Sequence, residues 1–276
     1  MNKLNFGTAG IPVSTQGDTL QGIQDVKKLG LDAMELEFVR SINISKEKAP
    51  EVKKTAKESN VILTCHAPYF INLNSLDKKK LEASKNRILA SARRAYESGA
   101  YSMCFHPGFY MKMDAQRVYE NIKKELQEIM KMLNQEGVDI WVRPETTGKG
   151  TQFGSLDELA RITSEVDGMM PCVDFSHLHA RSGGKFNTSE EFRQVLETIE
   201  KFHGKEGLKN MHIHVSGIAY SEKGERNHLN LKQSDMNYKD LMKVWKEFKI
   251  AGVVISESPN IEEDALLMKK TYKLLK

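Results

Sequence analysis

The sequence predicts an α/β protein that folds as a single (β/α)8 TIM barrel over residues 1–276. Short apolar or β-branched runs alternate with longer amphipathic stretches along the whole chain, which is typical of strands that are each followed by a helix. Eight such strand–helix units fit into 276 residues, a usual length for one barrel of this class. The runner-up is an open doubly wound sheet, but no G-x-G-x-x-G motif follows an expected strand.

Each expected strand is a run of six to eight residues that is rich in apolar or β-branched side chains. Amphipathic patterns fill the intervals between these runs. The clearest helix is expected from Asp77, a candidate N-cap, to Gly99, and the last helix at about 261–275. In chain order, the strands are expected at 3–8, 32–38, 61–66, 100–106, 138–145, 169–174, 208–215 and 252–257.

The composition is that of an ordinary globular protein, with 39% hydrophobic and 28% charged residues. A net charge of +4 permits nucleic-acid or phosphate partners but does not require them. Neither a signal peptide nor an apolar run long enough to span a bilayer is visible, so no membrane partner is expected. The cysteines Cys65, Cys104 and Cys172 are scattered without paired spacing, which favours reduced thiols in a cytoplasmic protein.

Six successive expected strands end in a histidine or a carboxylate, and these ends meet at one rim of a parallel barrel. One such residue alone is more often a hydrogen-bonded structural residue than a metal ligand. Six at the same depth, without counter-charges, would repel one another unless divalent cations are bound. The sequence therefore predicts a metal site at the C-terminal rim of the strands, formed by His66, His106, Glu145, Asp174, His212 and Glu257.

A mixture of imidazole and carboxylate ligands suits zinc, manganese or iron better than magnesium or calcium. The thiols are not expected among these ligands. Cys104 and Cys172 each precede a proposed ligand by two residues, so they should face the barrel interior one layer deeper. Cys65 has the opposite parity to His66 and should face the helices. Packing is the expected role of the cysteines.

A set of short motifs resembles the endonuclease IV family of apurinic/apyrimidinic (AP) endonucleases. The motifs are CHAPYFINL, FHPG, PETTGKGTQFG, DFSHLHA, MHIHV, HLNL and ESP, in the family's order and spacing from about residue 60 onward. The resemblance implies a TIM barrel of the xylose isomerase-like superfamily. It also implies a monomer that acts in base-excision repair and cleaves double-stranded DNA 5′ to abasic sites by means of a metal-bound hydroxide.

By the same resemblance, the protein would bind two or three Zn²⁺ ions, with Mn²⁺ or Fe²⁺ possible in some positions. Glu145 would bridge two ions, and Glu257 would also orient or deprotonate the nucleophile. The family pattern assigns His66, His106 and Glu145 to the first metal, Glu145, Asp174, His212 and Glu257 to the second, and His177 and His228 to the third.

One departure from the family pattern concerns the third metal. Arg226 stands where the family has an aspartate two residues before the loop histidine. The adjacent Glu225 could reach the metal instead, or it could be an exposed loop charge. His179 and His214 have no ligand counterpart in the resemblance. We expect each of them to donate a hydrogen bond to a ligand carboxylate or to a phosphate.

For DNA binding, the resemblance points to Tyr69 as a side chain that fills the gap in the base stack. Packing beneath its own loop is an equally good interpretation. Lys149 and Arg181 lie in expected rim loops and could contact phosphates, or they could be solubilising charges.

The alternative function is that of a one-metal sugar isomerase or epimerase from the same barrel superfamily. Glu35 and Glu37 on the second strand keep this alternative open, although one of them could pair with Arg40. Such an enzyme would not require His106, His177 and His228. A third possibility is a nucleic-acid-binding or regulatory barrel without catalysis.

Overall fold

The computed structural model describes residues 1–275, and within them eight parallel strands form a barrel. The hydrogen-bonded order is β6-β4-β3-β2-β1-β12-β9-β8. Isolated bridges from Val142 to Met169 and from Glu145 to Cys172 then join β6 to β8 and nearly close the ring. The predicted TIM barrel is confirmed. The barrel strands are β1 (Leu4–Ala9), β2 (Ala33–Glu37), β3 (Ile62–His66), β4 (Ser102–Phe105), β6 (Trp141–Pro144), β8 (Cys172–Asp174), β9 (Met211–Val215) and β12 (Gly252–Ser256).

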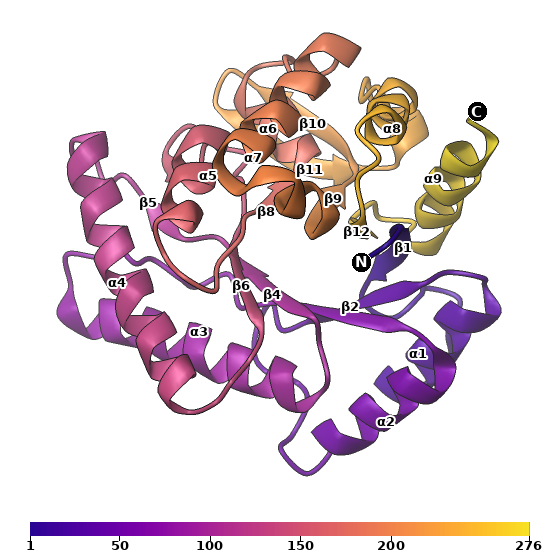
Figure 1. The fold of residues 1–276 in the computed structure, drawn as a ribbon, viewed down its shortest axis with the longest axis horizontal. Helices are drawn as coiled ribbons and strands as arrows, with labels where there is room; N and C mark the ends of the chain where they lie inside the picture. Colours follow the sequence, from indigo (N-terminus) through magenta and orange to yellow (C-terminus); the bar gives the residue numbers. More distant parts are fainter. Residues whose placement is uncertain (276) are drawn as a thin grey trace.

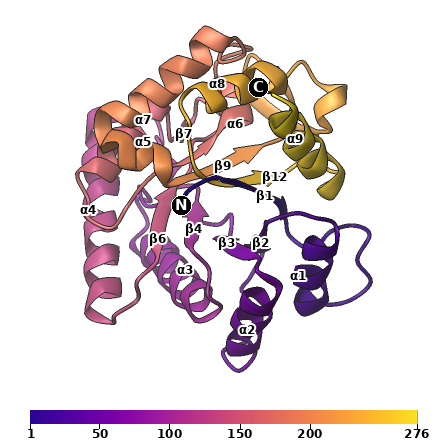
Figure 2. The ribbon, with the colours of Figure 1, turned by 45° about the vertical axis from the view of Figure 1, so that its right-hand side comes forward.

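Helices surround this barrel and alternate with its strands (Figures 1 and 2). Asp77 caps α3 as expected, because its carboxylate accepts hydrogen bonds from the backbone N–H groups of Lys79 and Lys80. The outer helices are α1 (Thr19–Lys28), α2 (Ala49–Ser59), α3 (Lys78–Glu97), α4 (Ala115–Gln135), α5 (Leu156–Ser164), α7 (Ser189–Lys209), α8 (Tyr238–Glu247) and α9 (Glu262–Leu274).

Three expected strands, those at 138–145, 169–174 and 208–215, begin three residues later than their sequence patterns indicate, and the last two show why. The strand expected at 208–215 starts at Met211, because Leu208 and Lys209 still belong to α7. The strand expected at 169–174 starts at Cys172, since Pro171 has no N–H to donate to the ladder. Both strands end at their predicted last residues, Asp174 and Val215, so these ends lie at the C-terminal rim of the barrel as expected.

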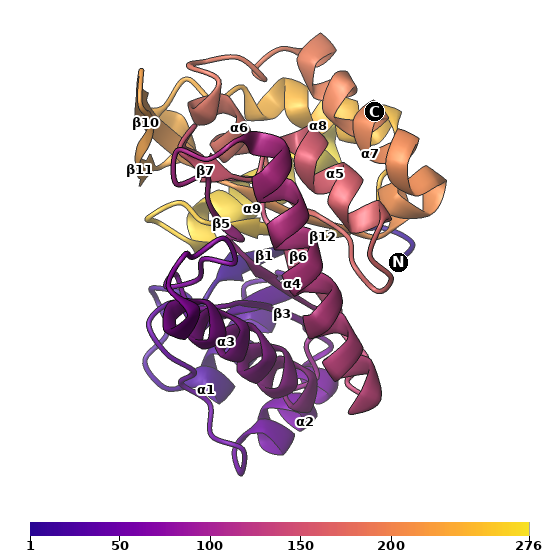
Figure 3. The same ribbon diagram turned by 90° about the vertical axis from the view of Figure 1, so that its left-hand side faces the viewer.

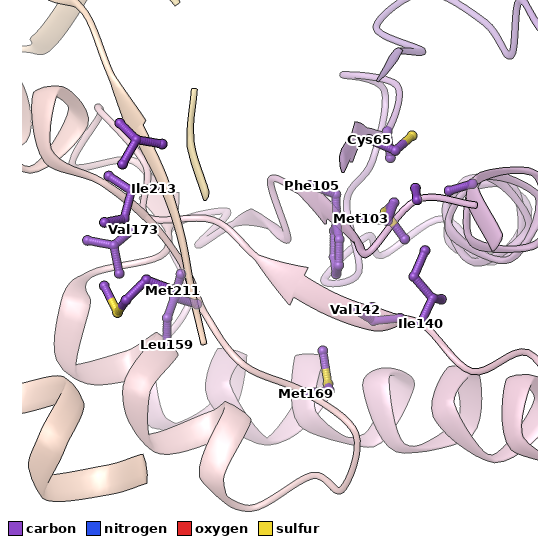
Figure 4. Packing of buried hydrophobic residues seen from close by; sticks show 14 of the residues in the cluster. Cys65, Met103, Phe105, Ile140, Val142, Leu159, Met169, Val173, Met211 and Ile213 are labelled. Carbon is purple, nitrogen blue, oxygen red and sulfur yellow. The ribbon is translucent and has the colours of Figure 1, made fainter. Parts of the chain in front are cut away.

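A continuous apolar layer fills the space between the barrel and the helices. Figure 4 shows Cys65, Met103 and Phe105 of β3 and β4 among these side chains. The expectation that Cys65 faces the helices is therefore confirmed. Cys104 and Cys172 are buried as well, but they lie outside this layer and face the barrel interior.

Additional short elements lie at the C-terminal rim of the barrel. The antiparallel pairs β5 (Gly108–Phe109) with β7 (Gln152–Phe153), and β10 (Gly217–Ser221) with β11 (Gly224–Leu229), project on the same side of the molecule (Figure 3). The short helix α6 (Phe175–Arg181) follows β8 directly, and the 3-10 helix η1 covers Leu231–Gln233. These elements carry several of the predicted site residues. Among residues 1–275, no helix is long and apolar enough to cross a membrane.

Candidate metal centre

A pocket of about 330 Å³ opens at the C-terminal ends of the strands. His66 ends β3, and His106, Glu145 and Glu257 follow β4, β6 and β12 directly. These four side chains line the pocket together with His177, Glu225 and His228. Four of the six residues expected at strand ends thus line one cavity, whereas Asp174 and His212 do not line it.

Glu145 lies between two sets of imidazoles. Its Oε2 is 3.1 Å from Nε2 of His66 and 3.5 Å from Nε2 of His106. Its Oε1 is 3.2 Å from Nδ1 of His177 and 3.3 Å from Nδ1 of His214. One fully buried carboxylate therefore faces imidazole nitrogens with each of its oxygens.

Backbone carbonyls fix the tautomers of several of these histidines. Nδ1 of His66 lies 2.7 Å from the carbonyl oxygen of Ala67, and Nδ1 of His177 lies 2.9 Å from that of Thr146. Nδ1 of His228 lies 3.1 Å from the carbonyl oxygen of Glu257. Because a carbonyl can only accept, Nδ1 donates in each ring, and Nε2 is the nitrogen that a cation would bind in place of a proton.

A second group consists of Glu145, Asp174, His214 and Glu257, whose ligand atoms all lie within 4.8 Å of one another. Four of these buried atoms have no hydrogen-bond partner in the part of the chain that the structure describes: Glu145 Oε1, Asp174 Oδ2, His214 Nδ1 and Glu257 Oε2. Unpartnered buried polar atoms are costly. A divalent cation at this point would satisfy all four, so the residues fit a metal.

Electrostatics at the centre favour bound positive charge. Burial alone would raise the pKa of Glu145, but the His214 and His106 imidazoles hold it well below its usual range. Burial opposes protonation of His66, yet the nearby Glu145 raises the pKa of that ring to about 10. The pKa of Asp174 is raised well above its usual value, mainly by burial and by the negative charges of Glu257 and Glu145, against the opposing effect of His177. Protons or cations must supply this positive charge.

In the structure, His214 lies where His212 was expected, beside Asp174 at the rim, and His212 lies deeper in the barrel. In the β8–β9 ladder, Asp174 pairs with His214, whereas Cys172 pairs with His212. His212 lies one layer deeper, with Nδ1 at 2.9 Å from Ser102 Oγ and Nε2 at 3.0 Å from Glu35 Oε2. The second-metal assignment of His212 is corrected to His214, because β9 continues to Val215 and only His214 reaches the depth of Asp174.

The third group consists of His177, Glu225 and His228. Glu225 Oε2 lies 3.7 Å from His177 Nε2, and its Oε1 lies 4.0 Å from His228 Nε2. The next residue, Arg226, is exposed. Gly224 (φ +91°) permits this arrangement, because a Cβ there would come within 2.3 Å of the Gly148 carbonyl oxygen. The structure therefore brings Glu225, and not Arg226, to the two histidines.

The remaining expected residues differ in their surroundings. Tyr69 is 58% exposed beside His66, and Lys149 is exposed at the edge of the pocket. The Arg181 guanidinium instead donates to Thr147 Oγ1 and to the carbonyl oxygens of Lys149 and Gln152, so it holds this loop and is not directed at solvent.

His179 does not support the metal ligands as expected. Its Nδ1 lies 2.8 Å from the Lys185 carbonyl oxygen, its Nε2 lies 3.1 Å from Asp235 Oδ1, and its ring packs against Tyr220. The residue connects α6 to the segment before α8. The helical position of His179, two residues after His177, directs it away from the pocket.

The eight-stranded parallel barrel, with imidazoles and carboxylates gathered at the strand ends in groups that could hold metal ions, places the protein among the TIM barrels. The chain belongs to the xylose isomerase-like TIM barrel family, whose model matches residues 23–276. It is 42% identical over 272 residues to an uncharacterized protein of Methanocaldococcus jannaschii, covering 99% of this chain and 98% of that protein. It is also 28% identical over 243 residues to a probable endonuclease 4 of Staphylococcus epidermidis, covering 86% of this chain and 78% of that protein.

Solved structures show the same fold in proteins of two kinds. Endonuclease IV from Thermus thermophilus superposes with a TM-score of 0.72 at 20% identity, over 96% of this chain and 97% of that one. A D-tagatose 3-epimerase-like protein gives a TM-score of 0.72 at 18% identity, over 96% of both chains. The resemblance to endonuclease IV in the motifs is confirmed, and the fold is shared with epimerases.

Proposed function

We propose that the protein is a metal-dependent AP endonuclease that hydrolyses the phosphodiester bond 5′ to abasic sites in double-stranded DNA. The observation that carries the proposal is the position of Glu145 between two sets of imidazoles, with the group of His177, Glu225 and His228 next to it. A hydrolase that acts on a phosphodiester needs positive charge on both sides of the reacting phosphorus. Cations held by neighbouring ligand groups along one pocket can supply this positive charge.

In this proposal the chain binds two or three zinc ions, with manganese or iron in some positions. When bound, the cations lower the pKa of a water molecule and stabilise the negative charge that develops on the phosphate. His66, His106 and Glu145 would hold the first ion, Glu145, Asp174, His214 and Glu257 the second, and His177, Glu225 and His228 the third.

Glu257 is the best candidate for handling the proton of the attacking water. Its side chain is 14% exposed at the pocket, and its Oε2 has no hydrogen-bond partner among the described residues. An ionised carboxylate at this point can orient a water molecule and accept its proton. Its own carbonyl also receives the Nδ1 proton of His228, which couples the second group to the third.

Side chains at the mouth of the pocket are suited to contact DNA. Tyr69 and Phe109 present exposed rings, 58% and 38% exposed, that can stack against bases or fill a gap in the duplex. Lys149 offers a charge for a backbone phosphate. We expect the protein to act on DNA as a monomer.

A one-metal sugar isomerase or epimerase is the second candidate, because Glu37 is half-buried and its pKa is raised to about 8 by burial and by Glu35 and Glu257. Such a carboxyl could exchange protons near neutrality. However, Glu37 does not line the pocket. The His177, Glu225 and His228 group would also have no task in a one-metal enzyme.

The decisive experiment uses a labelled duplex with one abasic-site analogue. Purified protein loaded with zinc is expected to cut it on the 5′ side and to leave a 3′-hydroxyl that a DNA polymerase can extend. An undamaged duplex is the matched control and stays intact, and a chelator should reduce the rate at least ~100-fold. The proposal is wrong if metal-loaded protein leaves the abasic strand intact. Epimerisation of a ketohexose by the same preparation would support the second candidate.

A further inference from the structure

Inside the barrel, below the rim, lies a cluster of polar side chains of which the proposed function uses only His214. Cys104 of β4, Cys172 of β8, and His212 and His214 of β9 place their ligand-type atoms within 4.8 Å of one another. All four residues are fully buried, as is Glu35 beside them. The centre of such a barrel is usually filled by branched apolar side chains. Burial of thiols, imidazoles and a carboxylate at this point therefore requires a specific partner.

The contacts in this cluster are close but poorly aligned for hydrogen bonding. Glu35 lies 3.0 Å from Nε2 of His212 and 2.9 Å from Nε2 of His214. Even so, His212 Nε2 and Glu35 Oε1 have no hydrogen-bond partner within residues 1–275. The other ring nitrogen of His212, Nδ1, does have a hydrogen-bond partner, because it lies 2.9 Å from Ser102 Oγ. The unpartnered nitrogen is thus held in place and points into the cluster.

The spacing of the donor atoms suits a tetrahedral metal. Zinc–sulfur bonds of about 2.3 Å and zinc–nitrogen bonds of about 2.0 Å put neighbouring ligand atoms roughly 3.3–3.8 Å apart. Cys104 Sγ lies 3.8 Å from His214 Nε2. The ladder sets Cys172 beside His212, so thiol and imidazole alternate around the same small volume.

We propose that Cys104, Cys172, His212 and His214 bind a zinc ion in the barrel interior, beneath the metal centre at the rim. Two thiolates and two imidazoles form a typical tetrahedral zinc site, and soft thiolates select zinc over magnesium, calcium or manganese. Two thiolates also neutralise the charge of the ion, which suits a site without solvent. This inference goes beyond the proposed function, because an interior zinc requires no DNA cleavage.

His214 would link the interior site to the rim. Its Nε2 faces Cys104, while its Nδ1 lies 3.3 Å from Glu145 Oε1 and 3.3 Å from Glu257 Oε1. A neutral imidazole has one lone pair, so binding cations at both nitrogens would require His214 to release its ring proton to solvent, as the thiols release theirs. Glu35 lies close to the same Nε2 atoms, so its carboxylate would have to turn aside or become a further ligand when an ion binds.

Cobalt(II) substitution tests the interior site directly. After metal removal, cobalt alone should give thiolate-to-cobalt charge-transfer absorption and the intense visible bands of a tetrahedral ion. A Cys104→Ser/Cys172→Ser variant should lose at least ~90% of the charge-transfer absorption and one zinc equivalent per chain. Cys65→Ser is the matched control, because Cys65 is equally buried but belongs to the apolar layer facing the helices, and it should leave the spectrum unchanged.

The wild-type spectrum decides the question even if the double variant fails to fold. Absence of a thiolate–cobalt band in folded, cobalt-loaded wild-type protein overturns the proposal, as does a Cys104–Cys172 disulfide in protein purified without reductant. Glu145→Gln should retain the band, because Glu145 belongs to the rim. A preparation with the band but without abasic-site cleavage would keep the interior site and reject the proposed function.

Discussion

Glu145 is the residue on which the chemistry of the rim depends most. Its Oε2 faces His66 and His106, and its Oε1 faces His177 and His214. The side chain is fully buried, so neither oxygen has water to replace a missing partner. An ionised, doubly shared carboxylate at this point can join two cations, whereas an uncharged amide of the same shape cannot.

Glu145→Gln is therefore expected to lower abasic-site cleavage at least ~100-fold and to reduce bound metal by at least one equivalent. Metal analysis and single-turnover cleavage on the same preparation would measure both effects. The matched control is Glu136→Gln, a surface carboxylate whose ion-pair partner among residues 1–275 is Arg93, and it should leave both quantities unchanged. Full activity in Glu145→Gln would mean that this glutamate does not bridge metals.

Residue types at the rim could be predicted from the sequence, but the depth of each residue could not. His212 and His214 have the same parity, so both face the barrel interior, and alternation alone cannot separate them. The ladder separates them by pairing His214 with Asp174. The direction of the His179 side chain could not be predicted either. The helix α6 starts immediately after β8, and its turn directs His179 to Asp235.

At the scale of elements, the order of strands and helices can be predicted from the sequence, whereas the residues at which they end and the contacts between them cannot. The alternation of apolar runs and amphipathic stretches predicts all the barrel strands, since each strand is buried on both faces. The start of β9 depends on how far α7 runs, which is decided by tertiary packing. Ion pairs between helices cannot be predicted from the sequence either, because they depend on which faces of neighbouring helices are in contact.

One such contact holds the end of α5 against α4. Glu165, the C-cap of α5, accepts from Lys123 Nζ and Tyr119 Oη of α4 and from Arg161 Nε. These donors, Lys123 first, hold the pKa of Glu165 at about 2. The carboxylate is 30% exposed, so solvent weakens the pair, and we expect a contribution of about 1 kcal/mol to the free energy of unfolding.

The pH dependence of this contribution follows from the depressed pKa. The stabilisation is fully present above the unfolded-state pKa of about 4.3 and is lost as the pH falls towards about 2. Glu165→Gln should therefore be less stable than wild type at pH 7, with a difference that shrinks below about pH 4. Urea unfolding of both proteins across this range would measure it. The exposed Glu206→Gln serves as control, and a difference for Glu165→Gln that stays constant with pH would contradict the linkage.

At the scale of the whole molecule, the barrel has one weakly paired seam among the described strands. Continuous ladders join the other neighbours, whereas β6 and β8 are connected only by isolated bridges. Glu145 follows β6 directly and Asp174 ends β8, so these two candidate ligands stand on opposite sides of the seam. A cation held by both would close the ring at the point where backbone hydrogen bonds are fewest.

Metal removal is therefore expected to loosen the seam as well as to stop catalysis. A ligand present at about 1,000 times its dissociation constant stabilises the folded state by about 4 kcal/mol, which corresponds to a shift in Tm of about 10 °C for a domain of this size. We expect EDTA to lower Tm by about this amount and zinc to restore it. Amide hydrogen exchange should quicken most in β6 and β8, because buried oxygens of Glu145, Asp174 and Glu257 then lack the partner that the cation supplied. The ladder between β1 and β12 provides the internal reference, since it joins continuous strands and none of the residues in its five pairs is a candidate ligand. Equal acceleration in both regions would show that the metals stabilise the barrel as a whole and do not close this seam.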